Sequence, residues 1–106
     1  MIRTELLSTG FYVPERVVTN EDLTQMMETS DEWIQQRSGI VERRWVEGGV
    51  DTSDLARRAA EAALERAGLE AAELDCLILA TLSPDVYFPG SGVFLQRKLG
   101  IRDVPC

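Results

Sequence analysis

The hydrophobic pattern is clearest between residues 53 and 67, where it predicts a long amphipathic helix. Apolar side chains recur there every three or four residues, as they do along one face of an α-helix. Residues 51–53 supply capping side chains before this stripe, and Gly68 suits the left-handed turn that ends a helix. Outside the stripe, Asp54 and Arg58 are spaced for an i,i+4 ion pair. The apolar positions are Leu55, Ala59, Ala62, Ala63 and Ala67.

A continuous apolar run, Cys-Leu-Ile-Leu-Ala at residues 76–80, follows that helix. Such a run is typical of a central strand that helices cover on both faces. We therefore expect Cys76 to be a buried and unreactive small hydrophobe. After a loop, residues 90–99 predict another helix, which Gly100 ends, and residues 101–104 indicate a further strand.

Shorter elements are predicted in the N-terminal half. Residues 6–13, closed by Pro14, have the character of a strand, and Asn20 is placed to cap a short helix that runs to Met27. Residues 41–46 alternate imperfectly between apolar and charged side chains, which predicts a short strand.

The segment Thr-Ser-Asp-Glu at residues 29–32 fits a capping box. In this motif the Thr29 hydroxyl accepts a hydrogen bond from the amide three residues later, and Glu32 reaches back to the cap. The helix that follows is expected to run to about Ser38, and Gly39 is expected to end it.

The order of these elements predicts an α/β fold. Helix, buried strand, loop and helix in succession indicate helices packed on a mixed, largely parallel sheet. Neither an internal repeat nor a low-complexity linker divides residues 1–106.

Charge and hydropathy argue against several classes of partner. The formal net charge is −7 and the pI is near 4.5, whereas a nucleic-acid surface needs clustered lysine and arginine. No segment approaches the roughly 20 apolar residues of a membrane span, and residues 1–7 lack the apolar stretch of a leader peptide. We therefore expect a cytoplasmic protein that binds neither nucleic acid nor membrane. A small basic group at Arg37, Arg43 and Arg44 still allows a bound phosphate.

The chain contains no histidine and two cysteines, which limits the chemistry that it can perform. Cys76 and Cys106 are far apart and show no Cys-x-x-Cys spacing, so we expect neither a disulfide framework nor a metal site. Nucleophilic catalysis generally needs a base beside the nucleophile, and histidine is the commonest one near neutral pH. We therefore assign no catalytic residue and no metal ligand to these 106 residues.

Gly90-Ser91-Gly92 superficially matches a dinucleotide-binding loop. However, Leu95 occupies the position at which the third glycine of that motif would fall. Glycines that allow a helix start to approach neighbouring backbone closely are the simpler interpretation.

Trp33 and Arg37 are the most informative pair for binding. Their i,i+4 spacing places an aromatic ring and a guanidinium on the same helix face. Such a face can stack a nucleobase and contact a phosphate. The same pair can instead form a local cation–π contact that supports the helix, so the residues alone leave both interpretations open.

Residues 29–44, TSDEWIQQRSGIVERR, closely resemble the N-terminal signature of the β-ketoacyl-acyl-carrier-protein synthase III family. Further matches follow in order and spacing along essentially the whole chain. They are GFYVP at 10–14, VTN at 18–20, SPD at 83–85, FP at 88–89 and LGI at 99–101. The resemblance implies that residues 1–106 are the N-terminal part of the first half of a thiolase-like fold. That fold consists of two duplicated α/β halves, and its second half is absent from this chain.

The resemblance also implies an acyltransferase that starts fatty-acid synthesis. In the family, an acyl group moves from acyl-CoA to a cysteine and then condenses with malonyl-acyl-carrier protein by decarboxylative Claisen chemistry. Acyl-CoA is a substrate, and no cofactor is implied. The family nucleophile lies downstream of the LGI motif, and its His and Asn partners lie in the second half. The 106-residue segment alone is therefore expected to be inactive.

Four residues acquire binding roles through the resemblance. Trp33 would stack on the adenine of CoA, Thr29 would form a hydrogen bond near it, and Arg37 would help to hold the nucleotide phosphates. Phe88 lies in a loop similar to one that crosses the dimer interface and lines the acyl pocket of the partner. The implied partners are thus acyl-CoA, acyl-carrier protein, the remainder of the fold and a second copy in a homodimer.

Two alternatives remain open. Related ketosynthase-like enzymes of secondary metabolism use the same scaffold for condensation or simple acyl transfer, and the N-terminal signature does not separate them from the synthase. A noncatalytic CoA-binding or interaction domain is the alternative from another class.

Overall fold

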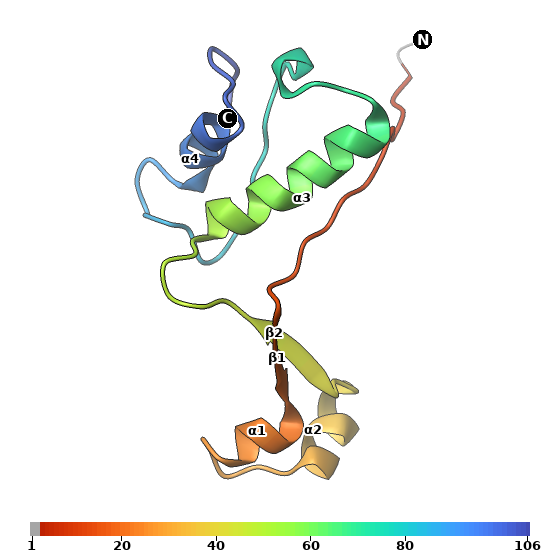
Figure 1. The fold of residues 1–106 in the computed structure, drawn as a ribbon, viewed down its shortest axis with the longest axis vertical. Coiled ribbons are helices and arrows are strands. Elements are labelled where there is room, and N and C mark those ends of the chain that lie inside the picture. The colour runs from red at the N-terminus through yellow and green to blue at the C-terminus, as the bar shows by residue number, and fades with distance from the viewer. Residues whose placement is uncertain (1–2) are drawn as a thin grey trace. The chain divides into compact units, whose positions relative to one another are not determined.

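The computed structural model describes residues 3–106 (Figure 1). Residues 1 and 2, which belong to the opening segment that was predicted to lack a leader peptide, lie outside the described part. The chain divides into two compact units. One unit is Val13–Gly49, and the other combines residues 3–12 with Val50–Cys106. The elements in chain order are β1 (Arg16–Thr19), α1 (Asn20–Thr24), α2 (Asp31–Ser38), β2 (Glu42–Trp45), α3 (Thr52–Ala67), the 3-10 helix η1 (Ala71–Glu73) and α4 (Ser91–Lys98).

The unit Val13–Gly49 is built on a two-stranded antiparallel sheet. Strand β1 pairs with β2 so that Arg16 lies opposite Trp45 and Thr19 lies opposite Glu42. The predicted strand at residues 41–46 is confirmed by β2, whereas β1 was not predicted. Only Val18 is buried in β1, so this strand lacks the regular alternation by which a half-buried strand is recognised.

Helix α1 differs from its prediction at both ends. Thr19 is the cap, not Asn20: its hydroxyl accepts a hydrogen bond from the Asp22 amide at 3.1 Å, and the Asp22 carboxylate accepts from the Thr19 amide at 2.8 Å. The helix ends at Thr24 rather than Met27. Met27 is exposed, so no buried apolar contact supports a further turn there.

Helix α2 ends as predicted but begins with a different cap. Gly39 closes it in the left-handed conformation, with φ of 71°. The predicted Thr29 capping box is wrong, because the Ser30 hydroxyl accepts from the Trp33 amide at 3.1 Å. Glu32, the expected reciprocal partner, instead accepts from the Gln36 side chain at 3.1 Å.

Helix α3 confirms the strongest prediction of the hydrophobic pattern. It begins one residue earlier than expected, after Asp51, and Gly68 ends it with φ of 68°. The predicted ion pair between Asp54 and Arg58 is wrong. Arg58 lies over the Tyr12 ring, 4.7 Å from its centroid, and Asp54 accepts from Lys98 at 2.7 Å. Partners from other segments replace an exposed i,i+4 pair that is worth only about 0.2–0.5 kcal/mol.

The strands predicted at residues 6–13, 76–80 and 101–104 are not formed within the described chain. Residues 76–80 instead form an extended segment that is covered on one side, since Leu77 is 8% exposed and Ile78 is 91% exposed. Cys76 is exposed, so its predicted burial is wrong. A strand needs a hydrogen-bonded neighbour, and the amide of Leu77 finds only the Pro105 carbonyl oxygen, at 2.9 Å.

The apolar core of this unit is small. Leu77, Leu95 and Ile101 form its buried centre. The helix predicted at residues 90–99 is confirmed by α4, which supplies Leu95. The described residues contain one sheet, and it is antiparallel, so the expected parallel pairing is not seen among them. Within the same residues, no helix has both the length and the apolar character needed to span a membrane.

The N-terminal segment runs along α3 in close backbone contact (Figure 1). Ser8 donates from its hydroxyl to the Ala63 carbonyl oxygen at 2.6 Å, and Arg66 donates to the Thr9 carbonyl oxygen at 2.9 Å. A Cβ added at Gly10 would meet the carbonyl oxygen of Ala59 and would lie 2.5 Å from the Ala63 nitrogen. Only glycine therefore fits between this segment and the helix.

We expect Gly10→Ala to lower the free energy of unfolding by about 1–3 kcal/mol, the usual cost of overpacking. The added methyl group meets helix backbone, which does not move aside as a flexible side chain would. Thermal or urea unfolding measures the effect. Gly48→Ala is the control, because a Cβ there meets no atom within 4 Å. Equal stability of the two variants would contradict the close packing.

Candidate functional site

Helix α2 presents an aromatic ring and a guanidinium on one exposed face. Trp33 is 57% exposed. The Cζ atom of Arg37, one turn further along the helix, lies 5.7 Å from the centroid of the Trp33 ring. The sequence spacing therefore places these two side chains together as predicted, and they form a cation–π contact.

A shallow pocket of about 230 Å³ lies beside this ring and is lined by Glu28, Thr29, Ser30 and Trp33. Thr29 contributes a hydroxyl whose oxygen is buried and has no hydrogen-bond partner in the described part of the chain. An unpaired buried hydroxyl is costly, and a ligand group in the pocket would supply a partner. Three of the four predicted binding residues, Thr29, Trp33 and Arg37, thus belong to one small region.

Asn20 holds α2 in place and was missed as a positioning residue. Its side chain is 2% exposed. The amide nitrogen donates to Asp31 at 2.7 Å and to the Ile40 carbonyl oxygen at 2.8 Å, while the amide oxygen accepts from Arg43 at 2.6 Å. Asn20 therefore links β2 to both ends of the segment that carries Trp33. The sequence offered no signal for this role, because every partner lies at least 11 positions away.

The charges around α2 are organised by hydrogen bonds. Asn20, and then Gln35, lower the pKa of Asp31 by donating hydrogen bonds to its carboxylate. A charged Asp31 in the first turn also complements the positive end of the helix dipole. Arg43 and Arg44 donate to backbone carbonyl oxygens, Arg43 to Val18 and Arg44 to Glu15 among others. Arg37, the third member of the predicted basic group, instead contacts an aromatic ring.

The fourth predicted residue, Phe88, lies in the other unit. It is 90% exposed and follows Tyr87, which is 95% exposed. Both cysteines are also exposed, and the Cys106 thiol lies 3.7 Å from the Gln96 side-chain oxygen. Gly92 lies near Cys106. A methyl group added at Gly92 would lie 3.6 Å from the Cys106 Cβ, which is an ordinary van der Waals distance.

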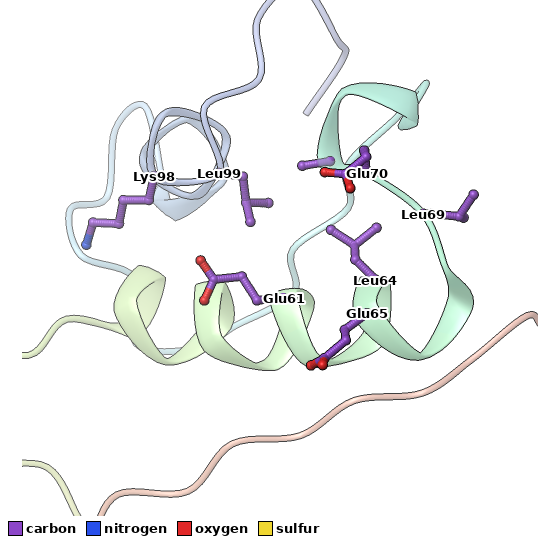
Figure 2. Close-up of a pocket in the computed structure, with 8 residues that line it drawn as sticks. Glu61, Leu64, Glu65, Leu69, Glu70, Lys98 and Leu99 are labelled. Atoms are coloured by element: carbon purple, nitrogen blue, oxygen red, sulfur yellow. The ribbon is translucent and has the colours of Figure 1, made fainter.

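A second hollow, of about 390 Å³, lies between α3 and α4 (Figure 2). Leucine side chains and three glutamates line it together with Lys98. Within residues 3–106 no cluster of histidine, cysteine, aspartate or glutamate is arranged to hold a metal ion. The lining residues are Glu61, Leu64, Glu65, Leu69, Glu70, Ala71, Lys98 and Leu99.

Comparison with known proteins identifies the class of this fold and then the group of relatives. No protein-family model matches the chain. The solved structure of β-ketoacyl-[acyl carrier protein] synthase III from Thermus thermophilus superposes with a TM-score of 0.87 at 41% identity, over 97% of this chain and 32% of that one. The priming β-ketosynthase from the R1128 polyketide biosynthetic pathway superposes with a TM-score of 0.84 at 30% identity, over 94% and 31%. The chain is therefore an α/β segment with the fold of these synthases.

Proteins similar in sequence narrow the comparison from the fold to one group of synthases. The chain is 51% identical over 100 residues to the β-ketoacyl-[acyl-carrier-protein] synthase III of Rhodospirillum centenum, which covers 94% of this chain. It spans 31% of the length of that relative. The predicted resemblance to the synthase III family is thus confirmed along almost the whole chain.

We expect Asn20→Ala to loosen α2 and to lower the free energy of unfolding by about 1–3 kcal/mol, because the buried groups that it binds lose their partner. Amide hydrogen exchange across α2 and thermal unfolding measure the two effects. Gln36→Ala, which removes an exposed amide that bonds Glu32, is the control and is expected to change stability by less than about 0.5 kcal/mol. Unchanged exchange in α2 of the Asn20 variant would remove this residue from the site.

Proposed function

We propose that this chain is part of a β-ketoacyl-acyl-carrier-protein synthase III that starts fatty-acid synthesis. The observation that carries the proposal is the match to such synthases over 94% of the chain at 51% identity. The reaction joins an acyl group from acyl-CoA to malonyl-acyl-carrier protein. It yields a β-ketoacyl-acyl-carrier protein, free CoA and carbon dioxide.

In this proposal the residues of the chain serve substrate binding, and the nucleophile lies in the remainder of the fold. The cysteine thiolate takes the acyl group and releases CoA. Decarboxylation of the malonyl group then generates a carbanion that attacks the thioester and expels the cysteine. The chain contains no histidine to assist such a thiolate, which is why we assign it binding roles.

The face of α2 is proposed to bind the nucleotide part of acyl-CoA. An aromatic ring has two faces, and Arg37 lies over one of them. We assign the other face of Trp33 to the adenine ring, because base–aromatic stacking tolerates an exposed platform. Arg37 is then positioned to attract the phosphates, and the unpaired hydroxyl of Thr29 offers a hydrogen bond to the nucleotide.

Phe88 is proposed to act on the acyl group rather than on the nucleotide. Phe88 and Tyr87 are both almost fully exposed, so they are available for contacts with another surface or ligand. We infer that the intact protein is a cytoplasmic homodimer in which this loop contributes to the acyl pocket.

A ketosynthase of secondary metabolism is the second candidate. The similarity to the priming β-ketosynthase of the R1128 pathway favours it, since that structure matches over nearly the same share of this chain. The two candidates differ in the acyl group and the carrier protein that the enzyme accepts. A noncatalytic CoA-binding domain is distinguished from both by the absence of any turnover.

The reaction itself is tested with the full-length protein that contains this chain. Acetyl-CoA and malonyl-acyl-carrier protein are expected to give β-ketoacyl product and carbon dioxide, as measured by mass spectrometry and release of labelled carbon dioxide. The 106-residue chain alone is expected to form no stable acetyl adduct on Cys76 or Cys106, since neither has an activating base. CoA binding without turnover would support the noncatalytic domain, and a stoichiometric adduct on the isolated chain would contradict the assignment of binding roles alone.

The nucleotide-binding role is tested by two substitutions in the full-length protein. Trp33→Ala is expected to weaken acyl-CoA binding by about 1–3 kcal/mol through lost stacking. Arg37→Ala is also expected to weaken it, but by an amount that falls as salt is added, because ions screen an exposed guanidinium–phosphate contact. Titration calorimetry at low and high salt measures both effects.

An acyl-pantetheine thioester, which lacks the nucleotide, is the control ligand for these two variants. Its binding is expected to remain unchanged, since neither side chain would touch it. Equal losses for CoA and pantetheine ligands would show that Trp33 and Arg37 support the fold through their cation–π contact instead.

A further inference from the structure

A partly buried polar cluster joins the loop at residues 83–90 to the helices beside it. Ser53 and Ser91 are 0% and 3% exposed, and both donate from their hydroxyls to the carboxylate of Asp85. The Ser53 amide donates to the same carboxylate at 2.9 Å, and the Asp85 amide donates to the Ser91 hydroxyl at 2.8 Å. The first turn of α3 and the first residue of α4 therefore hold the same loop residue from two sides.

Lys98 completes this cluster with a positive charge. Its ammonium lies 2.7 Å from the Ser53 hydroxyl and 2.7 Å from the Asp54 carboxylate. Figure 2 shows the side chain extending from α4 on the side where α3 begins. Burial acts to raise the pKa of Asp85, but the hydrogen bonds from Ser53 and Ser91, together with the charge of Lys98, outweigh it and leave the pKa lowered. The carboxylate therefore stays charged and keeps accepting near neutral pH.

The cluster fixes one end of the loop, and α4 fixes the other. Thr52 donates from its hydroxyl to the Ser83 carbonyl oxygen, so the loop is also held two residues before Asp85. At its far end, Gly90 adopts a φ of 92° and leads into α4. Between these anchors Tyr87 and Phe88 are almost fully exposed. A loop held by several partly buried hydrogen bonds presents its two aromatic side chains in a defined place.

We propose that Ser53, Asp85, Ser91 and Lys98 are positioning residues that set which acyl groups the enzyme accepts, by fixing the loop that presents Tyr87 and Phe88. This inference rests on the proposed function, because it takes the aromatic loop to contact the acyl chain. A pocket discriminates between acyl groups that differ by a few methylene groups only if its walls stay in place. None of the four residues touches the acyl group in this account, and they act through the position of the loop.

The test uses Lys98→Met in the full-length protein, because methionine fills a similar volume without the charge or the hydrogen bonds. Hydrogen exchange of the Ser53 and Asp85 amides, which both donate within the cluster, is expected to accelerate by about tenfold as the loop opens locally. The ratio of kcat/KM for hexanoyl-CoA to that for acetyl-CoA is expected to rise by about tenfold, because a loosened wall admits a longer chain. Lys98→Arg keeps the charge and is expected to preserve most of the normal ratio.

Arg97→Met is the matched control. It removes the same charge from the neighbouring residue of α4, which is exposed and contributes no side chain to the cluster. Neither the exchange of the loop nor the acyl ratio is expected to change. If Lys98→Met fails to fold by circular dichroism, Ser91→Ala removes one hydroxyl from the cluster without changing its charge, and it is expected to move both readouts in the same direction.

Each result bears on a different part of the proposal. Unchanged exchange in the folded Lys98 or Ser91 variant would overturn the positioning role, whatever the enzyme does. Faster exchange with an unchanged acyl ratio would overturn the role in acyl selection while leaving the proposed reaction intact. An absence of turnover with every acyl-CoA in the unsubstituted protein would overturn the proposed function and acyl selection together, and the exchange measurement would still decide whether the cluster holds the loop.

Discussion

Hydrogen bonds to a few buried polar side chains hold helix α2 and the loop at residues 83–90 in place. Within residues 3–106 the buried hydrophobic residues are Val18, Leu77, Leu95 and Ile101. The buried polar ones are Asn20, Ser53 and Ser91, and each has its hydrogen-bonding groups paired with neighbouring segments. A buried polar group that lacks a partner costs free energy, whereas a paired one favours a single arrangement of the segments that it joins. Asn20, Ser53 and Ser91 therefore fix the backbone of the segments that they join.

Local chemistry made most helix ends and the strand at residues 41–46 predictable, whereas the strands expected at residues 6–13, 76–80 and 101–104 are not formed in the described chain. The stripe before Gly68 and the glycine at position 39 specify helix ends through contacts within a few residues, and both ends were placed correctly. The exact N-caps were harder, since Thr19, Asn20, Thr29 and Ser30 are all capping residue types and tertiary contacts decide between neighbours. Strand formation at residues 76–80 depends on a neighbouring strand, which local sequence does not encode. The alternation of buried Leu77 and exposed Ile78 shows a segment with one face still open.

The candidate site likewise contains residues that local spacing predicts and residues whose partners lie far away in the sequence. Trp33 and Arg37 were predictable because one helical turn separates them, and their ring contact follows from that spacing. The partners of Asn20 and Lys98 lie up to 23 and 45 positions away, so no pattern in a single sequence joins them. Residue type was even misleading for Asn20, whose preference for helix caps suggested a local role. Asparagine supplies both donors and an acceptor, and burial uses all of them.

The two polar clusters hold different segments of the chain. Asn20 acts on α2 within Val13–Gly49, whereas Ser53, Asp85, Ser91 and Lys98 act on the aromatic loop within the other unit. Among the residues that the structure describes, the clusters share no residue and no hydrogen-bond partner. Substitutions without shared partners usually have additive energies. Under the proposed function, substitutions at the loop and its anchors are therefore expected to leave the Trp33 and Arg37 face of α2 unchanged.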